Sequence, residues 1–240
     1  MQGTLFDSHC HPCDRLSKAN LSVVNGTSPK DWTAVVELAK NSHRVIPAIG
    51  LHPWRVNEVA DNWQSQFLDA LPHAQVIGEI GLDRWISDSN LERQEAAFCW
   101  QLKQASLYNL PVSIHCLRAS GALIKVLGSQ RIPQRGFHLH AYNGSAQQVA
   151  QFTEMGAYFS FHACQLNKYS KKAGAAVQSI PIERILLETD APETIEKSNN
   201  ATSYLTRGYE RVAELKNMSI ERIQEPVEAT LLRVFNNVCA

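Results

Sequence analysis

Histidines and carboxylates stand at the ends of several short apolar runs in this chain. Imidazole and carboxylate groups together are the usual protein ligands of divalent ions such as zinc, manganese and iron. Any one such histidine is more often an ordinary hydrogen-bonded residue. A set of histidines and carboxylates at the ends of successive runs, however, favours a metal site. The set consists of His9, His11, Glu79, Asp83, His115, His140 and Asp190.

His9 and His11 have the spacing of two chelating residues on an extended backbone. Residues two apart on a strand share a face, so both imidazoles can bind one ion, whereas Cys10 points the other way. Cys10 and Cys13 have the C-x-x-C spacing of a structural zinc or redox site. No second pair completes that site, so we expect one core thiol and one loop thiol.

Two further polar residues follow apolar runs and are candidates for substrate contact. His52, within residues 50–54, can donate a hydrogen bond to a phosphate or a water, although it can equally pack against Trp54. Arg118, three residues after His115, can offer a planar fork to a phosphate or a carboxylate. The alternative for Arg118 is an ordinary surface arginine.

The elements that must position these residues alternate along the whole chain. Apolar runs rich in β-branched residues alternate with segments of helical periodicity, without a linker between them. The predicted strands are 4–9, 21–24, 45–49, 76–80, 111–115, 136–140, 157–161 and 184–188. The predicted helices are 30–41, 61–71, 91–109, 120–129, 145–155, 171–179, 204–217 and 220–237.

This alternation predicts an α/β fold with a parallel sheet, because parallel neighbours need crossover connections that are usually helical. Eight units in 240 residues favour a single-domain (β/α)8 TIM-type barrel over residues 1–240. A doubly wound open sheet is the alternative, although no glycine-rich phosphate loop opens a helix. On a barrel the carboxyl ends of the strands form the active-site face, so five strands would aim their polar groups at one mouth.

The composition favours a globular protein with a sizeable core. The chain has 23 Lys plus Arg against 23 Asp plus Glu, a formal net charge of zero, and 44% hydrophobic residues. This balance does not suit a highly basic nucleic-acid coat, and the Trp and Phe residues do not alternate with basic residues as in a single-strand stacking platform. No signal peptide or membrane-length apolar run is visible, so we expect a soluble cytoplasmic protein, with no membrane partner and with a monomer favoured.

Five motifs occur in order between residues 4 and 192. They are Phe6-Asp7-Ser8-His9-Cys10-His11, Gly50-Leu51-His52-Pro53, Gly78-Glu79-Ile80-Gly81-Leu82-Asp83, His140-Ala141-Tyr142-Asn143-Gly144-Ser145 and Leu186-Leu187-Glu188-Thr189-Asp190-Ala191-Pro192. In order and spacing they resemble the TatD family of metal-dependent hydrolases, and Gln94 and Phe98 resemble its Q-x-x-x-F continuation. The resemblance implies a distorted, amidohydrolase-like barrel that holds one or two divalent ions (Mg²⁺, Mn²⁺ or Zn²⁺). It also implies activities that include exonuclease and endonuclease cleavage of DNA.

The resemblance also implies a role for each matching residue. One ion would be held by His9, His11 and Asp190, and Glu79 would bridge it to a second ion held by His115 and His140. Substrate-binding or ligand-supporting positions would be His52, Arg118 and Glu188.

Three positions depart from the family pattern. Leu117 stands where the family has an arginine, and Arg118 comes one residue later. Phe161-His162-Ala163 replaces a glycine-containing turn, and Glu193-Thr194 replaces an aromatic-aliphatic pair. His138 lies two residues before His140 and competes with it as a ligand in principle, but the motif aligns on His140. The metal ligands are therefore expected to be complete, while the substrate pocket has diverged.

The leading hypothesis is a deoxyribonuclease that hydrolyses phosphodiester bonds with a metal-activated water, with Glu79 and Asp190 as catalytic residues and Asp190 accepting the proton of the water. We expect single-stranded DNA or a strand end as substrate, since a neutral protein is poorly suited to tight nonspecific duplex binding. Two alternatives stay open. One is a hydrolase of the same fold that acts on an ester, an amide or an aminoacyl-RNA bond, and the other is a metal-binding protein without catalysis.

Overall fold

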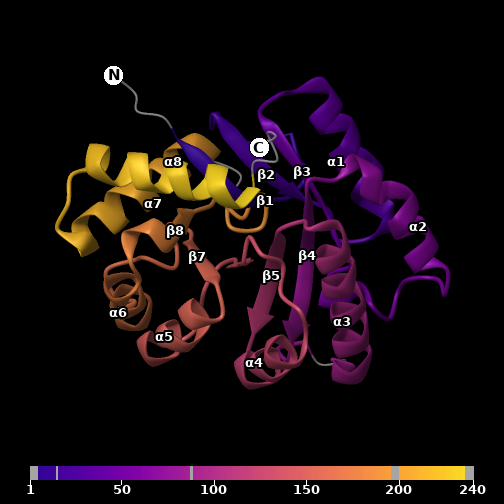
Figure 1. Cartoon of the computed structure of the whole chain (residues 1–240). Helices are drawn as coiled ribbons and strands as arrows, with labels where there is room; N and C mark the ends of the chain where they lie inside the picture. Colours follow the sequence, from indigo (N-terminus) through magenta and orange to yellow (C-terminus); the bar gives the residue numbers. More distant parts are fainter. Residues whose placement is uncertain (1–4, 15, 87–88, 196–199, 236–240) are drawn as a thin grey trace.

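Eight short strands form one parallel sheet in which each strand pairs with the next along the chain, as the computed structural model shows (Figure 1). The structure describes residues 5–14, 16–86, 89–195 and 200–235. The strands are β1 (Phe6–Cys10), β2 (Leu21–Asn25), β3 (Val45–Ile49), β4 (Val76–Asp83), β5 (Val112–Leu117), β6 (Phe137–Leu139), β7 (Ala157–Phe161) and β8 (Ile185–Leu187). The predicted (β/α)8 order is confirmed, and the doubly wound alternative is wrong.

Helices follow most strands and pack on the outside of the sheet (Figure 1). They are α1 (Pro29–Asn41), α2 (Trp63–Ala70), α3 (Leu91–Tyr108), α4 (Ser120–Ser129), α5 (Ala146–Glu154), α6 (Lys171–Ser179), α7 (Ala201–Lys216) and α8 (Ile220–Phe235). Within the described residues, β1 leads to β2 without a helix, whereas β8 is followed by two. The barrel is therefore distorted at its first and last units. None of the described helices is long and apolar enough to cross a membrane.

Side-chain and backbone hydrogen bonds tie β1 to the segment after β8 and to α7. The Asp7 carboxylate of β1 accepts hydrogen bonds from the backbone nitrogen and the hydroxyl of Thr189, at 2.9 and 2.8 Å. The hydroxyl of Tyr209, from α7, accepts from the Phe6 nitrogen at 3.1 Å and donates to the Phe6 carbonyl at 3.2 Å. Just beyond β8, the Asp190 nitrogen donates to the His9 carbonyl of β1 at 2.9 Å. These contacts nearly close the barrel.

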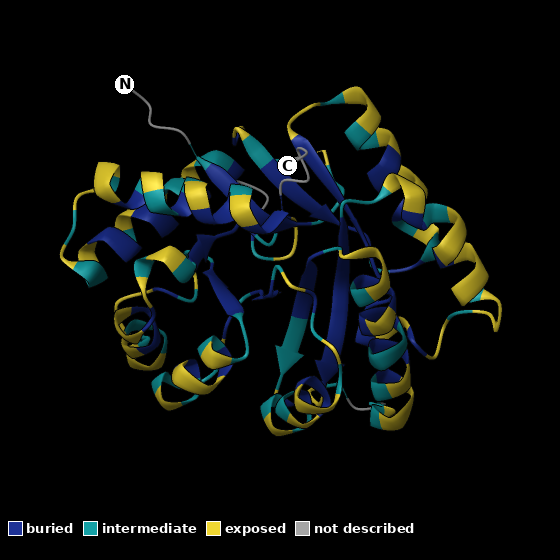
Figure 2. Cartoon of the chain, viewed as in Figure 1, coloured by how far each residue is buried: buried dark blue, intermediate teal, exposed yellow. Residues whose placement is uncertain are grey.

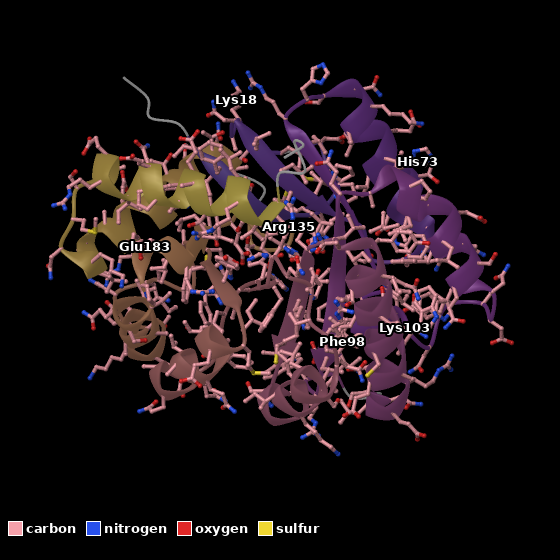
Figure 3. All side chains as sticks on the ribbon, in the orientation of Figure 1. Lys18, His73, Phe98, Lys103, Arg135 and Glu183 are labelled. Atoms are coloured by element: carbon pink, nitrogen blue, oxygen red, sulfur yellow. The ribbon has the colours of Figure 1, made fainter. Side chains whose placement is uncertain are left out.

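Apolar side chains fill both the space under the helices and one end of the barrel. Strand residues are almost all buried, whereas the helices expose one face each (Figure 2). Phe98 of α3 is in the main core, and Lys103 of the same helix is exposed; both are labelled in Figure 3. Leu231, Val234 and Phe235 of α8 pack in one cluster with residues of β1, β2, β3, β4, β7 and β8. The apolar face of α8 thus packs against β1 and β8 and extends the cluster that side chains from six strands form at one end of the barrel.

Irregular pairing occurs in the two strands that carry His9 and Glu79. The register shifts between Asp7 and Cys10 in β1, and between Ile77 and Ile80 in β4. Each shift sets one more residue on that strand than on its partner, which is the signature of a β-bulge and re-aims the local side chains. Gly78 fits here because a Cβ atom would lie 2.7 Å from the Cβ of Ser113.

Candidate metal centre

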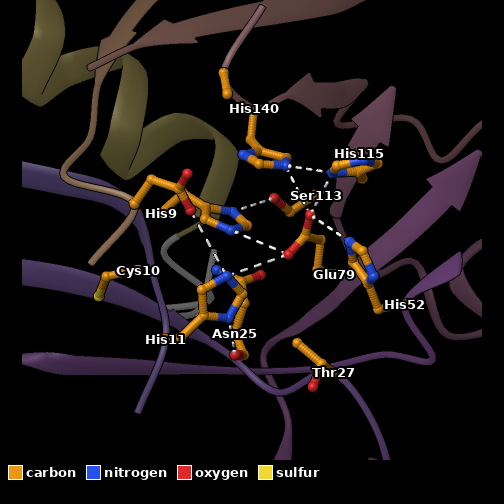
Figure 4. A network of polar contacts seen from close by, with 12 residues as sticks. His9, Cys10, His11, Asn25, Thr27, His52, Glu79, Ser113, His115 and His140 are labelled. Carbon is orange, nitrogen blue, oxygen red and sulfur yellow. Dashed lines mark hydrogen bonds and ion pairs between the residues drawn. The ribbon is translucent and has the colours of Figure 1, made fainter. Parts of the chain in front are cut away.

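The carboxylate of Glu79 is buried at the centre of five imidazoles (Figure 4). Its Oε2 atom lies 3.4 Å from His9 Nε2 and 3.3 Å from His11 Nε2. Its Oε1 atom faces His115 Nδ1, His140 Nε2 and His52 Nε2 at 2.9, 2.7 and 3.2 Å. The two oxygens therefore face different sets of histidines. Cys10, on β1 between two of these histidines, points away from Glu79 and is buried beside α1 and α7, as the strand alternation predicts.

His11 presents an unprotonated nitrogen to this centre. Its Nδ1 lies 2.9 Å from the backbone carbonyl of Asn25, which can only accept a hydrogen bond. The proton of a neutral His11 is therefore on Nδ1, and the lone pair of Nε2 faces Glu79 and Asp190. The Nε2 atom of His9 is buried without a hydrogen-bond partner. An orphaned imidazole nitrogen beside a carboxylate fits a metal ligand, because a metal-bound histidine coordinates through its unprotonated nitrogen.

Asp83 supports His115 from behind. Its Oδ2 atom accepts hydrogen bonds from His115 Nε2 and Trp54 Nε1, both at 2.8 Å. Burial opposes the shift, but the bonds from His115, Trp54 and the Trp85 nitrogen hold the pKa of Asp83 below its ordinary value. The buried amide of Gln94 bonds the Asp83 nitrogen and carbonyl at 2.8 and 3.0 Å. With Asp83 on Nε2, His115 keeps Nδ1 for an ion, the arrangement in which an outer carboxylate orients a ligand histidine.

His52 acts on Glu79 rather than on the open mouth. Its Nδ1 accepts a hydrogen bond from the Trp54 nitrogen at 3.1 Å, so its Nε2 carries the proton that is directed at Glu79. Burial lowers the pKa of His52 to about 4, which keeps the ring neutral. The preceding residue, Leu51, is fixed by the buried side chain of Gln101, which bonds its nitrogen and carbonyl.

Asp190 and Glu188 flank the centre at the end of β8. Asp190 is partly exposed, and its Oδ1 atom lies 3.7 Å from His11 Nε2. Burial raises the pKa of Asp190 to about 7. Glu188 is completely buried: its Oε1 atom accepts from the Ala141 nitrogen at 2.8 Å and lies 3.8 Å from His140 Nδ1. Asp190 thus faces the mouth, whereas Glu188 is enclosed by Ala141, His140 and Ser160.

Arg118 lies at the exposed rim of the mouth. Its guanidinium stacks on the ring of Trp85, 3.7 Å from the ring centroid. Trp85 is 58% exposed, and Trp54, whose indole nitrogen binds Asp83, is 44% exposed. The sequence shows no aromatic residue next to Arg118, because Trp85 follows β4 and Arg118 follows β5. The folded chain nevertheless stacks Arg118 on Trp85, and it places Trp54 beside His115 with their ring centroids 6.1 Å apart.

The charge of Glu79 is fixed by its neighbours. Burial alone would raise the pKa of the carboxyl, but the imidazoles of His140, His52 and His9 hold it well below its ordinary value. The pKa of His140 is raised well above its ordinary value despite burial, chiefly by Glu79. An anionic carboxylate among imidazole nitrogens from the ends of three strands and from one loop suits divalent ions.

Three groups of ligand atoms in the described chain converge closely enough to hold an ion. They are His9 with His11 and Asp190, His115 with Glu79 and His52, and His9 with His140 and Glu188. His140 faces the same Glu79 oxygen as His115. His138, the competing histidine, lies deeper in the barrel with both ring nitrogens next to serine hydroxyls. Such a cluster at the mouth of a parallel (β/α)8 barrel defines a metal-dependent hydrolase.

Similarity to known proteins identifies the family of this hydrolase. The sequence matches the family of TatD related DNase over residues 6–236, so the chain belongs to that family. It is 28% identical to the uncharacterized metal-dependent hydrolase YjjV of Escherichia coli strain K12, over 96% of this chain and 97% of that protein. It is 26% identical to the 3'-5' ssDNA/RNA exonuclease TatD of Citrobacter rodentium, over 89% of this chain and 85% of that protein. The crystal structure of Escherichia coli YjjV matches with a TM-score of 0.87 at 25% identity, over 97% of this chain and 98% of that one.

Proposed function

We propose that this hydrolase is a TatD-type deoxyribonuclease that cleaves phosphodiester bonds from the end of a DNA strand. The observation that carries the proposal is the division of the Glu79 carboxylate. One oxygen faces His9 and His11, and the other faces His115 and His140. A carboxylate shared in this way suits two divalent ions, the arrangement that phosphatases and nucleases use at phosphorus. The first ion would add Asp190 as a ligand.

The chain supplies positioning and proton transfer around this centre. Bound divalent ions would lower the pKa of a water and stabilise charge on the phosphoryl oxygens. Asp190 is partly exposed beside His11, so its carboxylate is placed to accept the proton of that water. His52 donates to Glu79 Oε1 and holds the carboxylate in place. We therefore propose that His52 supports Glu79 instead of contacting substrate. In the same way, Glu188 would hold the chain after β6 through the Ala141 nitrogen instead of contacting substrate.

Arg118 and the two exposed tryptophans are the proposed substrate contacts. A guanidinium offers a planar fork to a phosphate, and aromatic rings stack on bases of any sequence. Trp85 already carries Arg118 on one face, so a base would reach its other face or the exposed part of Trp54. The zero net charge favours few phosphate contacts, and hence a single strand or a strand end rather than a long duplex.

We also propose a monomer in the cytoplasm, folded as one domain over residues 1–240.

The experiment follows end-labelled single-stranded DNA with metal-stripped protein that is resupplied with Mg²⁺, Mn²⁺ or Zn²⁺. We expect stepwise shortening that needs metal and falls more than a hundredfold in Glu79→Gln, because even the outer partners of a metal ligand are worth about 10- to 100-fold. Glu58→Gln, an exposed glutamate on the surface, is the matched control and keeps full activity. Intact DNA with every ion, from protein that binds metal, would reject the nuclease proposal and direct the search to esters, amides and aminoacyl-RNA.

A further inference from the structure

A column of buried polar side chains runs through the barrel beneath the metal centre. His9 Nδ1 lies 3.1 Å from the hydroxyl of Ser113, which lies 3.1 Å from His138 Nδ1. His138 Nε2 lies 2.6 Å from the hydroxyl of Ser160, which lies 2.5 Å from Glu188 Oε2. All five side chains are completely buried. The column links β1, β5, β6 and β7 to the residue after β8, although its members are far apart in the sequence.

The hydrogen bonds of this column have only one consistent direction when His138 is neutral. A carboxylate accepts only, so Ser160 must give its proton to Glu188. Ser160 then has no proton left for His138 and accepts from Nε2 of that ring. A neutral His138 that is protonated on Nε2 has a lone pair on Nδ1, so Ser113 must donate to it. Ser113 in turn accepts from Nδ1 of His9.

The neutral state of His138 follows from its surroundings. The ring is completely buried and packs edge-on against Phe235, with the centroids 5.5 Å apart. The nearest Glu188 oxygen is 4.0 Å from Nε2, beyond hydrogen-bond reach. A charge on a ring buried without a hydrogen-bonded carboxylate is costly, so this geometry favours the neutral form of His138.

We infer that Ser113, His138 and Ser160 form a polar relay, a chain of hydrogen bonds whose direction is set by the Glu188 carboxylate. This relay keeps the proton of His9 on Nδ1, so that the lone pair of His9 Nε2 is directed at the metal centre. The inference rests on the proposed role of His9 as a ligand, and it assigns positioning roles to three residues that no motif of the chain indicated. Stacking of His140 on His9, with centroids 3.9 Å apart and an interplanar angle of 11°, fixes the plane of the ring. The relay fixes which nitrogen carries the proton.

If the relay ran the other way, His9 would be closed to metal. A cationic His138 would donate to both serines, and Ser113 would then donate to His9 Nδ1. The proton of His9 would move to Nε2, which faces Glu79 at 3.4 Å. The relay therefore selects between a ligand form and a blocked form of the same histidine, through the known tendency of a bond at one ring nitrogen to set the state of the other.

The first test is spectroscopic and needs no turnover. Long-range proton–nitrogen correlation spectra of metal-free protein labelled with ¹⁵N-histidine, recorded at neutral pH, report which nitrogen of each ring is protonated. We expect His9 to carry its proton on Nδ1 and His138 on Nε2. A His9 ring protonated on Nε2, or a cationic His138, would overturn the inference. DNA cleavage does not enter this readout, so failure of the relay and failure of the nuclease proposal are separate results.

The second test compares two variants of His138 by calorimetric titration with Mn²⁺. His138→Phe removes both contacts, and we expect Mn²⁺ affinity to fall about 10- to 100-fold. His138→Gln carries one acceptor and one donor, as the neutral ring does, and is expected to restore affinity to within about threefold of the wild type. His43→Gln, on an exposed loop, is the matched control. Equal affinity of wild type and His138→Phe, or equal losses in both His138 variants, would overturn the relay. Should His138→Phe fail to fold, the spectra of the wild type decide.

Discussion

Tyr209→Phe is expected to destabilise the place where the barrel nearly closes between β1 and β8, here called the seam, while the fold stays the same. The Tyr209 hydroxyl is buried and serves both the nitrogen and the carbonyl of Phe6. Both groups of a strand residue point to the same side, and here that side faces β8, where regular pairing is missing. Phenylalanine keeps the ring and its apolar contacts but leaves both backbone groups of Phe6 buried and unpaired.

The cost follows from those two groups. A buried backbone group without a partner costs about 1–3 kcal/mol, and relief of the hydroxyl burial recovers part of the sum. We therefore expect a loss of about 2–4 kcal/mol in the free energy of unfolding. For a protein of this size, that loss corresponds to a fall of roughly 4–16 °C in Tm, at about 2–4 °C per kcal/mol.

The assay is thermal and urea unfolding of metal-free protein, followed by circular dichroism. Tyr108→Phe, at the exposed end of α3, is the matched control and is expected to change stability by less than about 0.5 kcal/mol. A Tyr209→Phe variant that melts within about 1 °C of the wild type would refute the reasoning, because the seam would then not depend on this hydroxyl.

Three other changes test different parts of the structure. Asp83→Asn weakens the acceptor behind His115, so we expect Zn²⁺ affinity to fall about 10- to 100-fold in competition with a chelator; unchanged affinity would exclude the supporting role. Gly81→Ala puts a Cβ atom into the His115 carbonyl at a φ of 146°, and should cost more than about 3 kcal/mol in urea unfolding. Gly121→Ala, which meets no atom within 4 Å, should be neutral or stabilising by up to about 1 kcal/mol; similar losses in both would contradict the steric argument. Burial lowers the pKa of His162 in the folded protein, so the unfolded chain binds a proton more readily. The contribution of His162 to the free energy of unfolding is therefore complete above its ordinary pKa of 6.5 and is lost as the pH falls below 6.5. His162→Gln should flatten the acid side of the stability profile, and parallel profiles would count against that contribution.

Strand and helix positions follow from the sequence because burial sets a simple pattern. Residues 45–49 and 157–161 are apolar runs between helical segments, and both are strands with the predicted bounds. The fourth strand was predicted to end at Ile80 but continues to Asp83. In the sequence, Gly81 suggests the end of a strand. In the sheet, however, Gly81 pairs with His115, and its missing side chain allows the close approach of β5.

The candidate ligands were also accessible to sequence reasoning, since they recur at strand ends and a barrel collects those ends. His9 and His11 share a face as their spacing predicts, and Cys10 points away. The residues behind the ligands were not accessible in this way. Ser113 and His138 become neighbours only through the register of β5 and β6. One-letter patterns do not encode such contacts, because they depend on how several strands close around one interior.

The central claim is that the two oxygens of Glu79 face two ions. The most direct measurement is anomalous X-ray diffraction from crystals loaded with Mn²⁺. We predict two anomalous peaks, one among His9, His11 and Asp190 and the other beside His115 and His140, with Glu79 between them. A single peak that does not touch Glu79, or peaks only elsewhere on the protein, would contradict it.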